Sequence, residues 1–65
     1  MGVEKLCLSI TETAYALGVS RPTVYNLLKT DGFPAIRIGG RTMIPVDGLR
    51  QWVEIQVKKR QEENV

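Results

Sequence analysis

The chain has 65 residues, of which nine are Lys or Arg and seven are Asp or Glu, so its formal net charge is +2. This length predicts one domain over residues 1–65, and no apolar run approaches the roughly 18 residues of a membrane span or resembles a signal peptide. One cysteine and no histidine exclude an internal disulfide and a zinc site. We therefore predict a cytoplasmic protein without a cofactor.

The first element expected is a helix over residues 10–17, preceded by a short extended segment. Ser9 begins a capping-box sequence, Ser-Ile-Thr-Glu, in which the serine accepts a helical N–H and Glu12 reaches back. Gly18 supplies the left-handed residue that ends the helix. Its inward face carries Ala14 and Leu17. The extended segment is expected to place apolar residues against the core, namely Leu6 or Leu8, with Cys7 as a small buried residue.

A second helix is expected directly after a tight turn that Val19 plugs. Ser20 caps this helix, and Pro22 fits its first turn because N–H groups there have no intrahelical partner. Apolar residues at i, i+3 and i+4 mark the buried stripe, namely Val24, Leu27 and Leu28. The polar face and exposed N-terminal end carry Arg21, Thr23, Tyr25 and Asn26.

Two short alternating runs around Gly39-Gly40 predict a β-hairpin whose tight turn requires positive φ. The residues expected to face the core are Ile36, Ile38 and Ile44. The residues expected on the outward face are Arg37, Arg41 and Met43.

A third helix is expected after Pro45, with Asp47 as its cap. The residues of its apolar stripe are Leu49, Trp52, Val53 and Val57, with Trp52 in the core. From about Lys58 onward the chain is polar, so we expect a frayed tail.

The order helix, tight turn, helix, hairpin and helix predicts a mainly α fold with a β-hairpin. In the first pair, the small Ala14 allows close approach, Gly18 makes the sharp turn, and Val24 and Leu27 lock the second helix. This is the helix-turn-helix arrangement, whose second helix can lie in the DNA major groove with its N-terminal residues at the base edges.

The segment LSITETAYALGVSRPTVYNLLKTDGFPAIRIGGRTMIPVDGLRQWV, residues 8–53, resembles the excisionase-family helix-turn-helix domain. That family is a small winged-helix relative of the MerR-type DNA-binding domain. The most specific pieces are LGVSRPTVYNLL, FPAIRIGGRTMIP and the pair Leu49 and Trp52. The resemblance implies a recognition helix in the major groove and a wing, residues 36–44, at the neighbouring minor groove or backbone. Members act as recombination directionality factors of phages or mobile elements, or as small transcriptional regulators.

Charge is concentrated in the middle of the chain. Residues 1–19 carry a net charge of −1 and residues 42–65 balance, whereas residues 20–41 carry +3. A basic middle favours an anionic partner. Arg21 stands at a helix start, where its charge opposes the helix dipole, so we predict that it contacts a guanine or a phosphate. Arg41 lies beside the turn and is predicted to reach into or across the minor groove.

The remaining candidates for DNA contact each have an alternative explanation. Thr23 and Asn26 are equally explained as exposed polar residues, and the ring of Tyr25 either meets a phosphate or packs beside the hairpin. Arg37 is equally explained as a solvated strand residue. The wing glycines, Gly39 and Gly40, are first a requirement of the turn, and close approach to DNA is an additional possibility.

The function predicted is sequence-specific binding of double-stranded DNA, as an excisionase that acts with an integrase or recombinase and with further copies of itself. No nucleophile is paired with a base, so we predict that the protein is not an enzyme. We also predict no small-molecule ligand and no membrane partner. Little sequence follows Val53, which favours a monomer or weak dimer in solution. A small MerR-like transcriptional regulator and a protein-interaction module without nucleic acid are the alternatives.

Overall fold

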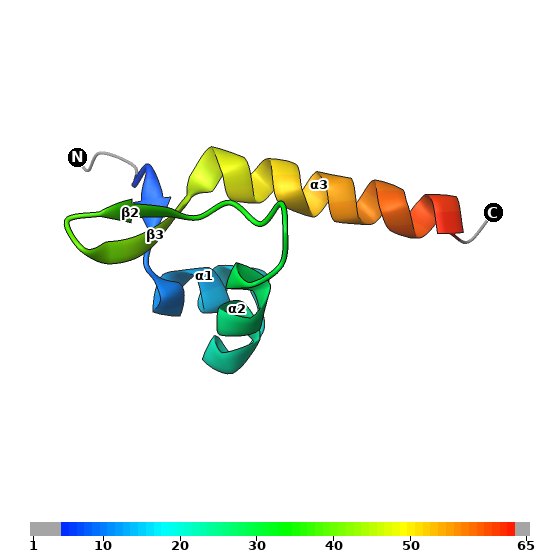
Figure 1. Ribbon diagram of the computed structural model, residues 1–65. Helices are drawn as coiled ribbons and strands as arrows, with labels where there is room; N and C mark the ends of the chain where they lie inside the picture. The colour runs from blue at the N-terminus through cyan, green and yellow to red at the C-terminus, as the bar shows by residue number, and fades with distance from the viewer. Residues whose placement is uncertain (1–4, 64–65) are drawn as a thin grey trace.

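A computed structural model describes residues 5–63, with side chains described for residues 5–61. Its elements are β1 (Cys7–Leu8), α1 (Ile10–Leu17), α2 (Arg21–Leu28), β2 (Ile36–Ile38), β3 (Arg41–Pro45) and α3 (Val46–Glu63). In Figure 1, α1 and α2 lie below the small sheet, and α3 runs along the other side and projects past the remaining elements. This mainly α fold with a β-hairpin confirms the fold class predicted from the sequence.

The capping box sets the start of α1. Ser9 Oγ accepts the Glu12 N–H at 3.1 Å, and Glu12 Oε1 accepts the Ser9 N–H at 3.0 Å, so both N-terminal donors are satisfied. Lys5 Nζ also donates to the Glu12 carboxylate, and this contact, with the Ser9 N–H, holds the pKa of Glu12 below its ordinary value. Gly18 ends the helix with a left-handed φ of 75°. The bounds of α1 are those predicted.

The turn between α1 and α2 brings the two helices into contact. Ser20 caps α2 by accepting the Thr23 N–H at 3.4 Å, as predicted. Ala14 and Val24 are buried where the helices meet, which explains their small and branched side chains. Val19 is 39% exposed, so the prediction that it plugs the turn is wrong. Ala14 and Val24 already fill the space between the helices, and Val19 is left at the surface.

The sheet has three antiparallel strands in the order β1-β3-β2. Strand β1 was not predicted as a strand, because its two residues are too few for an alternating pattern to be recognised. Leu8 pairs with Ile44 and anchors the N-terminal segment. Leu6 is 81% exposed, and Cys7 is only half-buried in this edge strand, so burial of Cys7 was wrongly predicted.

The hairpin register corrects the predicted faces. Ile38 pairs with Arg41 and Ile36 with Met43, and residues paired across an antiparallel ladder share a face. Ile36 and Ile38 therefore lie on the outward face, where they are 44% and 52% exposed. The prediction that both face the core is wrong. The two-residue turn pairs Ile38 with Arg41, and alternation along β3 then puts Ile44 on the opposite face. Ile44 alone of the three is buried, with no exposed surface.

The core is formed around Phe33, Ile44 and Leu49. The ring of Phe33 meets that of Trp52 edge to face, with centroids 5.0 Å apart, an arrangement that aromatic pairs favour. The half-buried residues packed around this centre are Leu8, Ile10, Leu17, Leu27, Leu28 and Trp52. All three helices and two of the strands thus meet at one centre, which holds the hairpin against the helix pair.

Helix α3 differs from its prediction in three respects. It begins at Val46, so Asp47 lies in its first turn and does not cap it. Val53 and Val57 are 37% and 51% exposed, and the C-terminal half of α3 projects past the other elements (Figure 1). The helix continues to Glu63, past the position where the sequence predicts fraying, and the fraying itself stays a prediction. None of the helices described in residues 5–63 is long and apolar enough to cross a membrane.

Candidate nucleic-acid interface

Helix α2 presents Arg21 and Tyr25 on one face. They are four residues apart, a spacing that makes side chains neighbours on a helix. Val24 lies between them in sequence and has no exposed surface, so it packs this turn of α2 against the rest of the protein. Arg21 is exposed and Tyr25 is 50% exposed. The first turn of α2 is thus held by its cap and its core residue, while its basic and aromatic side chains stay accessible.

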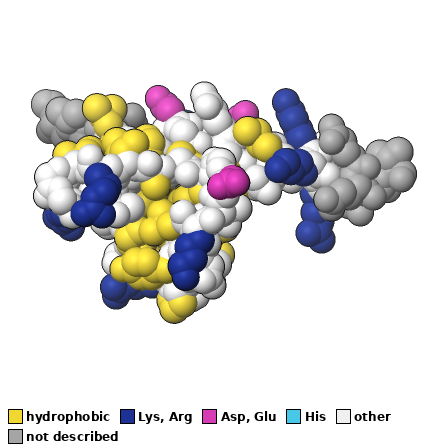
Figure 2. Space-filling model, viewed as in Figure 1, with side chains coloured by type: hydrophobic (Ala, Val, Ile, Leu, Met, Phe, Trp, Pro, Cys, Tyr) yellow, Lys and Arg dark blue, Asp and Glu magenta, His cyan; other side chains and the backbone are white. Residues whose placement is uncertain are grey.

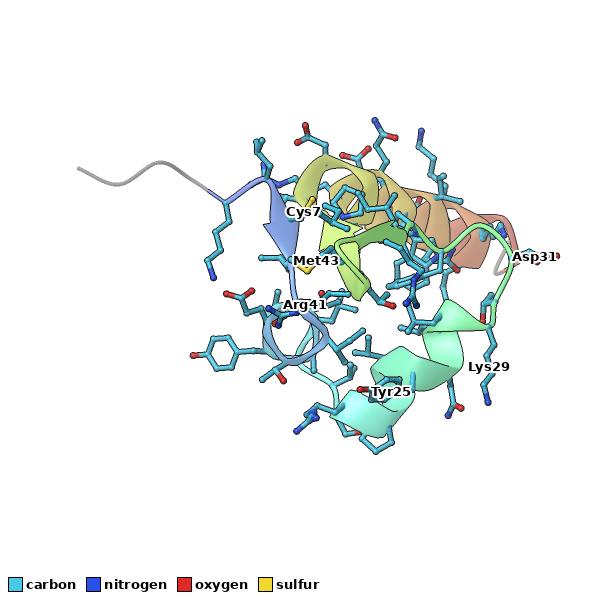
Figure 3. All side chains as sticks on the ribbon, turned by 60° about the vertical axis from the view of Figure 1, so that its left-hand side comes forward. Cys7, Tyr25, Lys29, Asp31, Arg41 and Met43 are labelled. Atoms are coloured by element: carbon cyan, nitrogen blue, oxygen red, sulfur yellow. The ribbon has the colours of Figure 1, made fainter. Side chains whose placement is uncertain are left out.

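A surface groove joins α2 to the hairpin. It has a volume of about 360 Å³, and its lining residues are Ser9, Ile10, Thr11, Arg21, Tyr25, Arg41 and Thr42. They come from the start of α1, from α2 and from β3. Figure 3 shows Arg41 of the hairpin and Tyr25 of α2 on the same side of the molecule. Two of the predicted contacts, Arg21 and Arg41, therefore belong to one surface.

The charge of this groove is basic and uncompensated. Both of its charged lining residues are arginines. The one ion pair recorded among residues 5–61 joins Lys5 to Glu12, so neither Arg21 nor Arg41 has a carboxylate partner within that part of the chain. Guanidinium groups left free in this way are suited to bind phosphates or base edges.

The other polar residues predicted on α2 do not line the groove. Thr23 Oγ1 lies 2.9 Å from Ser20 Oγ, so its hydroxyl takes part in the helix cap. Asn26 is exposed, and its backbone carbonyl accepts the Lys29 N–H and the hydroxyl of Thr30 at the end of the helix. Both residues stay candidates for DNA contact on the exposed surface of α2.

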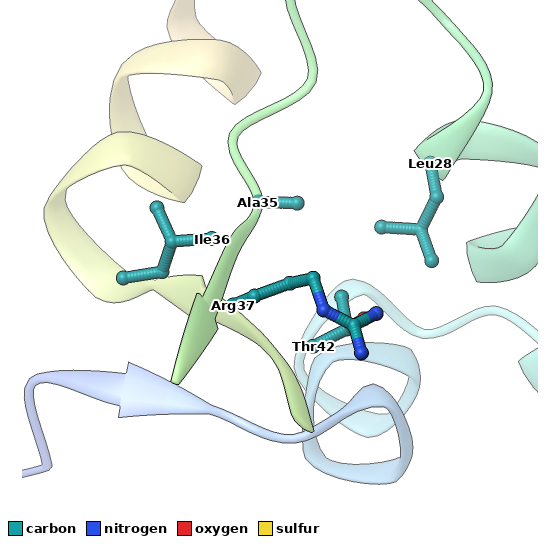
Figure 4. A pocket seen from close by; sticks show the side chains of 5 residues that line it. All are labelled: Leu28, Ala35, Ile36, Arg37 and Thr42. Carbon is teal, nitrogen blue, oxygen red and sulfur yellow. The ribbon is translucent and has the colours of Figure 1, made fainter. Parts of the chain in front are cut away.

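The tip of the hairpin has the predicted glycine turn. Gly39 and Gly40 have φ values of 57° and 81°, which glycine adopts without steric cost. Arg37 does not share the face of Arg41 and Met43, contrary to the prediction. Alternation along the strand sets it beside its partner Thr42, in a pocket that Leu28 lines from α2 (Figure 4). Arg37 Nη2 donates to the Gly40 carbonyl at 3.1 Å, so its guanidinium stabilises the turn.

The sequence interpretation missed the contribution of α1 and of Thr42 to the groove. Ser9, Ile10 and Thr11 stand at the start of α1 and line it beside Arg21. The capping box located this helix start, but nothing local in the sequence places it beside the hairpin. That proximity follows from the way β3 packs between β1 and β2.

Two short helices joined by a tight turn, followed by a hairpin that shares a surface with the second helix, define a winged helix-turn-helix. The family described as "Helix-turn-helix domain" matches residues 7–56. An excisionase from Streptomyces ambofaciens is 32% identical over 50 residues, which cover 77% of this chain and 81% of that protein. No solved structure matches the chain. The chain therefore belongs to the excisionase family of helix-turn-helix domains.

Proposed function

We propose that the protein binds double-stranded DNA in a sequence-specific manner and acts as an excisionase, an architectural partner of an integrase during recombination. The observation that carries this proposal is the single groove lined by Arg21 and Arg41, in a chain whose relative is an excisionase. In this role the protein bends or covers DNA in the cytoplasm, together with further copies of itself, and performs no bond chemistry. The recombinase supplies the catalytic residues.

The dimensions of the interface support this proposal. Helix α2 has eight residues, and an α-helix with its side chains is about 10–12 Å in diameter, which fits a major groove about 12 Å wide. Insertion by its N-terminal end places Arg21 at the base edges, where an arginine forms bidentate hydrogen bonds to guanine. Arg41 then lies at the neighbouring backbone or minor groove, which a wing residue reaches from outside.

The charge of this groove does not favour the alternative function, a protein-interaction module that binds no nucleic acid. Such a module would present an acidic or apolar surface around Arg21, Asn26 and Arg41. No acidic residue lines the groove within the described part of the chain. A transcriptional regulator would use the same interface, so the two outputs differ in the DNA site and not in the residues that bind it.

Replacement of Arg41 by alanine is expected to weaken binding by a similar factor for all duplexes, because a wing contact to phosphate or minor groove carries little sequence information. We expect a loss of about threefold to tenfold, which corresponds to one exposed charge-assisted contact. Fluorescence anisotropy with the preferred duplex and a scrambled duplex measures both affinities.

The control for Arg41→Ala is Lys59→Ala, which removes the same charge from the projecting part of α3, away from the hairpin (Figure 1). We expect this control to change either affinity by less than about twofold, as for an exposed charge far from the ligand. Equal losses in the two variants would show that net charge, and not the wing, governs the affinity, and would overturn the role of Arg41.

A further inference from the structure

Helix α3 carries a second surface that is largely exposed. Four residues follow one another along α3 at intervals of four, three and four positions, so they lie on one face of the helix. They are Val46, Arg50, Val53 and Val57. We call these four residues the α3 stripe. Val53 and Val57 are 37% and 51% exposed, Arg50 is exposed and Val46 is half-buried. The stripe is therefore an apolar face with one cationic side chain at its centre.

The stripe continues into a groove between α1 and α3. Its volume is about 430 Å³, and Ala16 and Leu17 line it from α1 opposite Val46 and Val53 of α3. Figure 2 shows basic side chains on the projecting half of α3. An apolar channel of this kind accepts the apolar face of another helix.

The charged residues that flank the stripe have no partners among the described residues. The only ion pair recorded for residues 5–61 is Lys5 with Glu12. The charged residues of α3 on the side of the stripe are Asp47, Arg50, Glu54, Lys58 and Arg60. Arg50 and Glu54 are four residues apart on α3 but form no ion pair within the helix. These charges are thus free to pair with a second molecule.

We propose that a second copy of this chain occupies the stripe, with the two α3 helices antiparallel about a twofold axis near residue 52. In this arrangement Val46 of one copy packs against Val57 of the other, and the aliphatic part of Arg50 packs against Val53. Each contact occurs twice, as in any interface between identical surfaces.

The order of charges along α3 selects the antiparallel arrangement. It sets Arg50 opposite Glu54 and Asp47 opposite Lys58 of the other copy, so each of these four residues meets a charge of opposite sign. A parallel arrangement in register would oppose Arg50 to Arg50 and Lys58 to Lys58, which is unfavourable. The surface of one copy is therefore complementary to itself in one orientation only.

This dimer does not require DNA. The groove that Arg21 and Arg41 line contains no residue of α3, so the dimer leaves it accessible. The contact area is limited to one helix and its flanking groove, and small interfaces of this kind are weak. We therefore expect a dimer that forms as the concentration rises from the micromolar to the millimolar range.

Val57→Glu is expected to weaken self-association at least about tenfold, because it would set a carboxylate against an apolar partner twice in each dimer. Sedimentation equilibrium of the full chain without DNA measures the association constant. The matched control is Ile55→Glu. Ile55 is 50% exposed, against 51% for Val57, but lies on the opposite side of α3, so the control should self-associate like the wild type. Circular dichroism of both variants verifies that they are folded.

A charge exchange tests the orientation. Glu54→Arg is expected to weaken association by about threefold to tenfold, because each dimer loses two exposed ion pairs and gains two repulsions. Adding Arg50→Glu to it restores the pairs and should restore association. A wild-type protein that stays monomeric up to millimolar concentration, or equal loss in Val57→Glu and Ile55→Glu, would overturn the proposal. Either result leaves DNA binding through Arg21 and Arg41 as it stands.

Discussion

Replacement of Arg21 by alanine should cost about 1–3 kcal/mol of affinity for the preferred duplex and reduce the discrimination between that duplex and a scrambled one. The cause is the position of Arg21 at the exposed start of α2, where the side chain reaches the base edges when the helix enters the major groove. A bidentate contact to guanine contributes to the affinity for one sequence and little to the affinity for others. Titration of both duplexes by fluorescence anisotropy measures the ratio directly.

The control for Arg21→Ala is Lys29→Ala. Lys29 is the C-terminal cap residue of the same helix, so it carries the same charge at the end of α2 away from the groove. We expect it to leave the discrimination unchanged and to reduce both affinities by less than about threefold. If Arg21→Ala lowers the affinities for the two duplexes by the same factor, Arg21 contacts phosphate and does not read a base.

Ile44→Ala should destabilise the protein strongly and lower the midpoint of its thermal unfolding. Ile44 has no exposed surface and stands in the core with Phe33 and Leu49, and removing a buried isoleucine side chain down to alanine costs about 2–5 kcal/mol. A domain of this size has a total stability of roughly 3–10 kcal/mol, so the loss is a large fraction of it. The far-UV circular dichroism signal and its thermal midpoint measure the effect.

Ile38→Ala is the matched control, and it also tests the register of the hairpin. Ile38 is 52% exposed on the outward face, so its truncation should change the free energy of unfolding by no more than about 0.5 kcal/mol. The alternating pattern in the sequence predicted that Ile38 and Ile44 are both in the core. Comparable destabilisation by the two variants would support that prediction and contradict the register described above.

Local chemistry made the helix pair predictable. The bounds of α1 and the caps of both helices follow from Ser9, Glu12, Gly18 and Ser20, because hydrogen bonds within a few residues decide where a helix starts and stops. The positive φ of the Gly39-Gly40 turn was predicted for the same reason. Features set by a few neighbouring residues can be inferred from the sequence alone.

The errors concern features that depend on distant contacts. Ile36 and Ile38 are apolar, as core residues are, but they are 44% and 52% exposed because the hairpin register puts them on the face opposite the buried Ile44. The apolar residues of α3 likewise predicted a buried stripe, whereas Val53 and Val57 are 37% and 51% exposed. Periodicity identifies an apolar face but does not show whether another element covers it.

The candidate site was predictable in part. The helix-turn-helix order and the hairpin indicated Arg21 and Arg41, and the structure places both in one groove. The face of Arg37 was predicted wrongly, because alternation alone does not show which residues oppose one another, and the two-residue turn sets Arg37 beside Thr42. Thr11 and Thr42 were missed because their proximity to Arg21 depends on the packing of α1, α2 and β3.

The central claim is that one basic groove, formed by α2 and the wing, binds duplex DNA. Titration of wild-type protein with duplex from its own genomic flank, repeated over a range of salt concentrations, tests this claim most directly. If about four phosphates are neutralised, the logarithm of the association constant should fall against the logarithm of salt concentration with a slope of about −3.6. An affinity that does not change with salt, or the absence of binding at low salt, would contradict the claim.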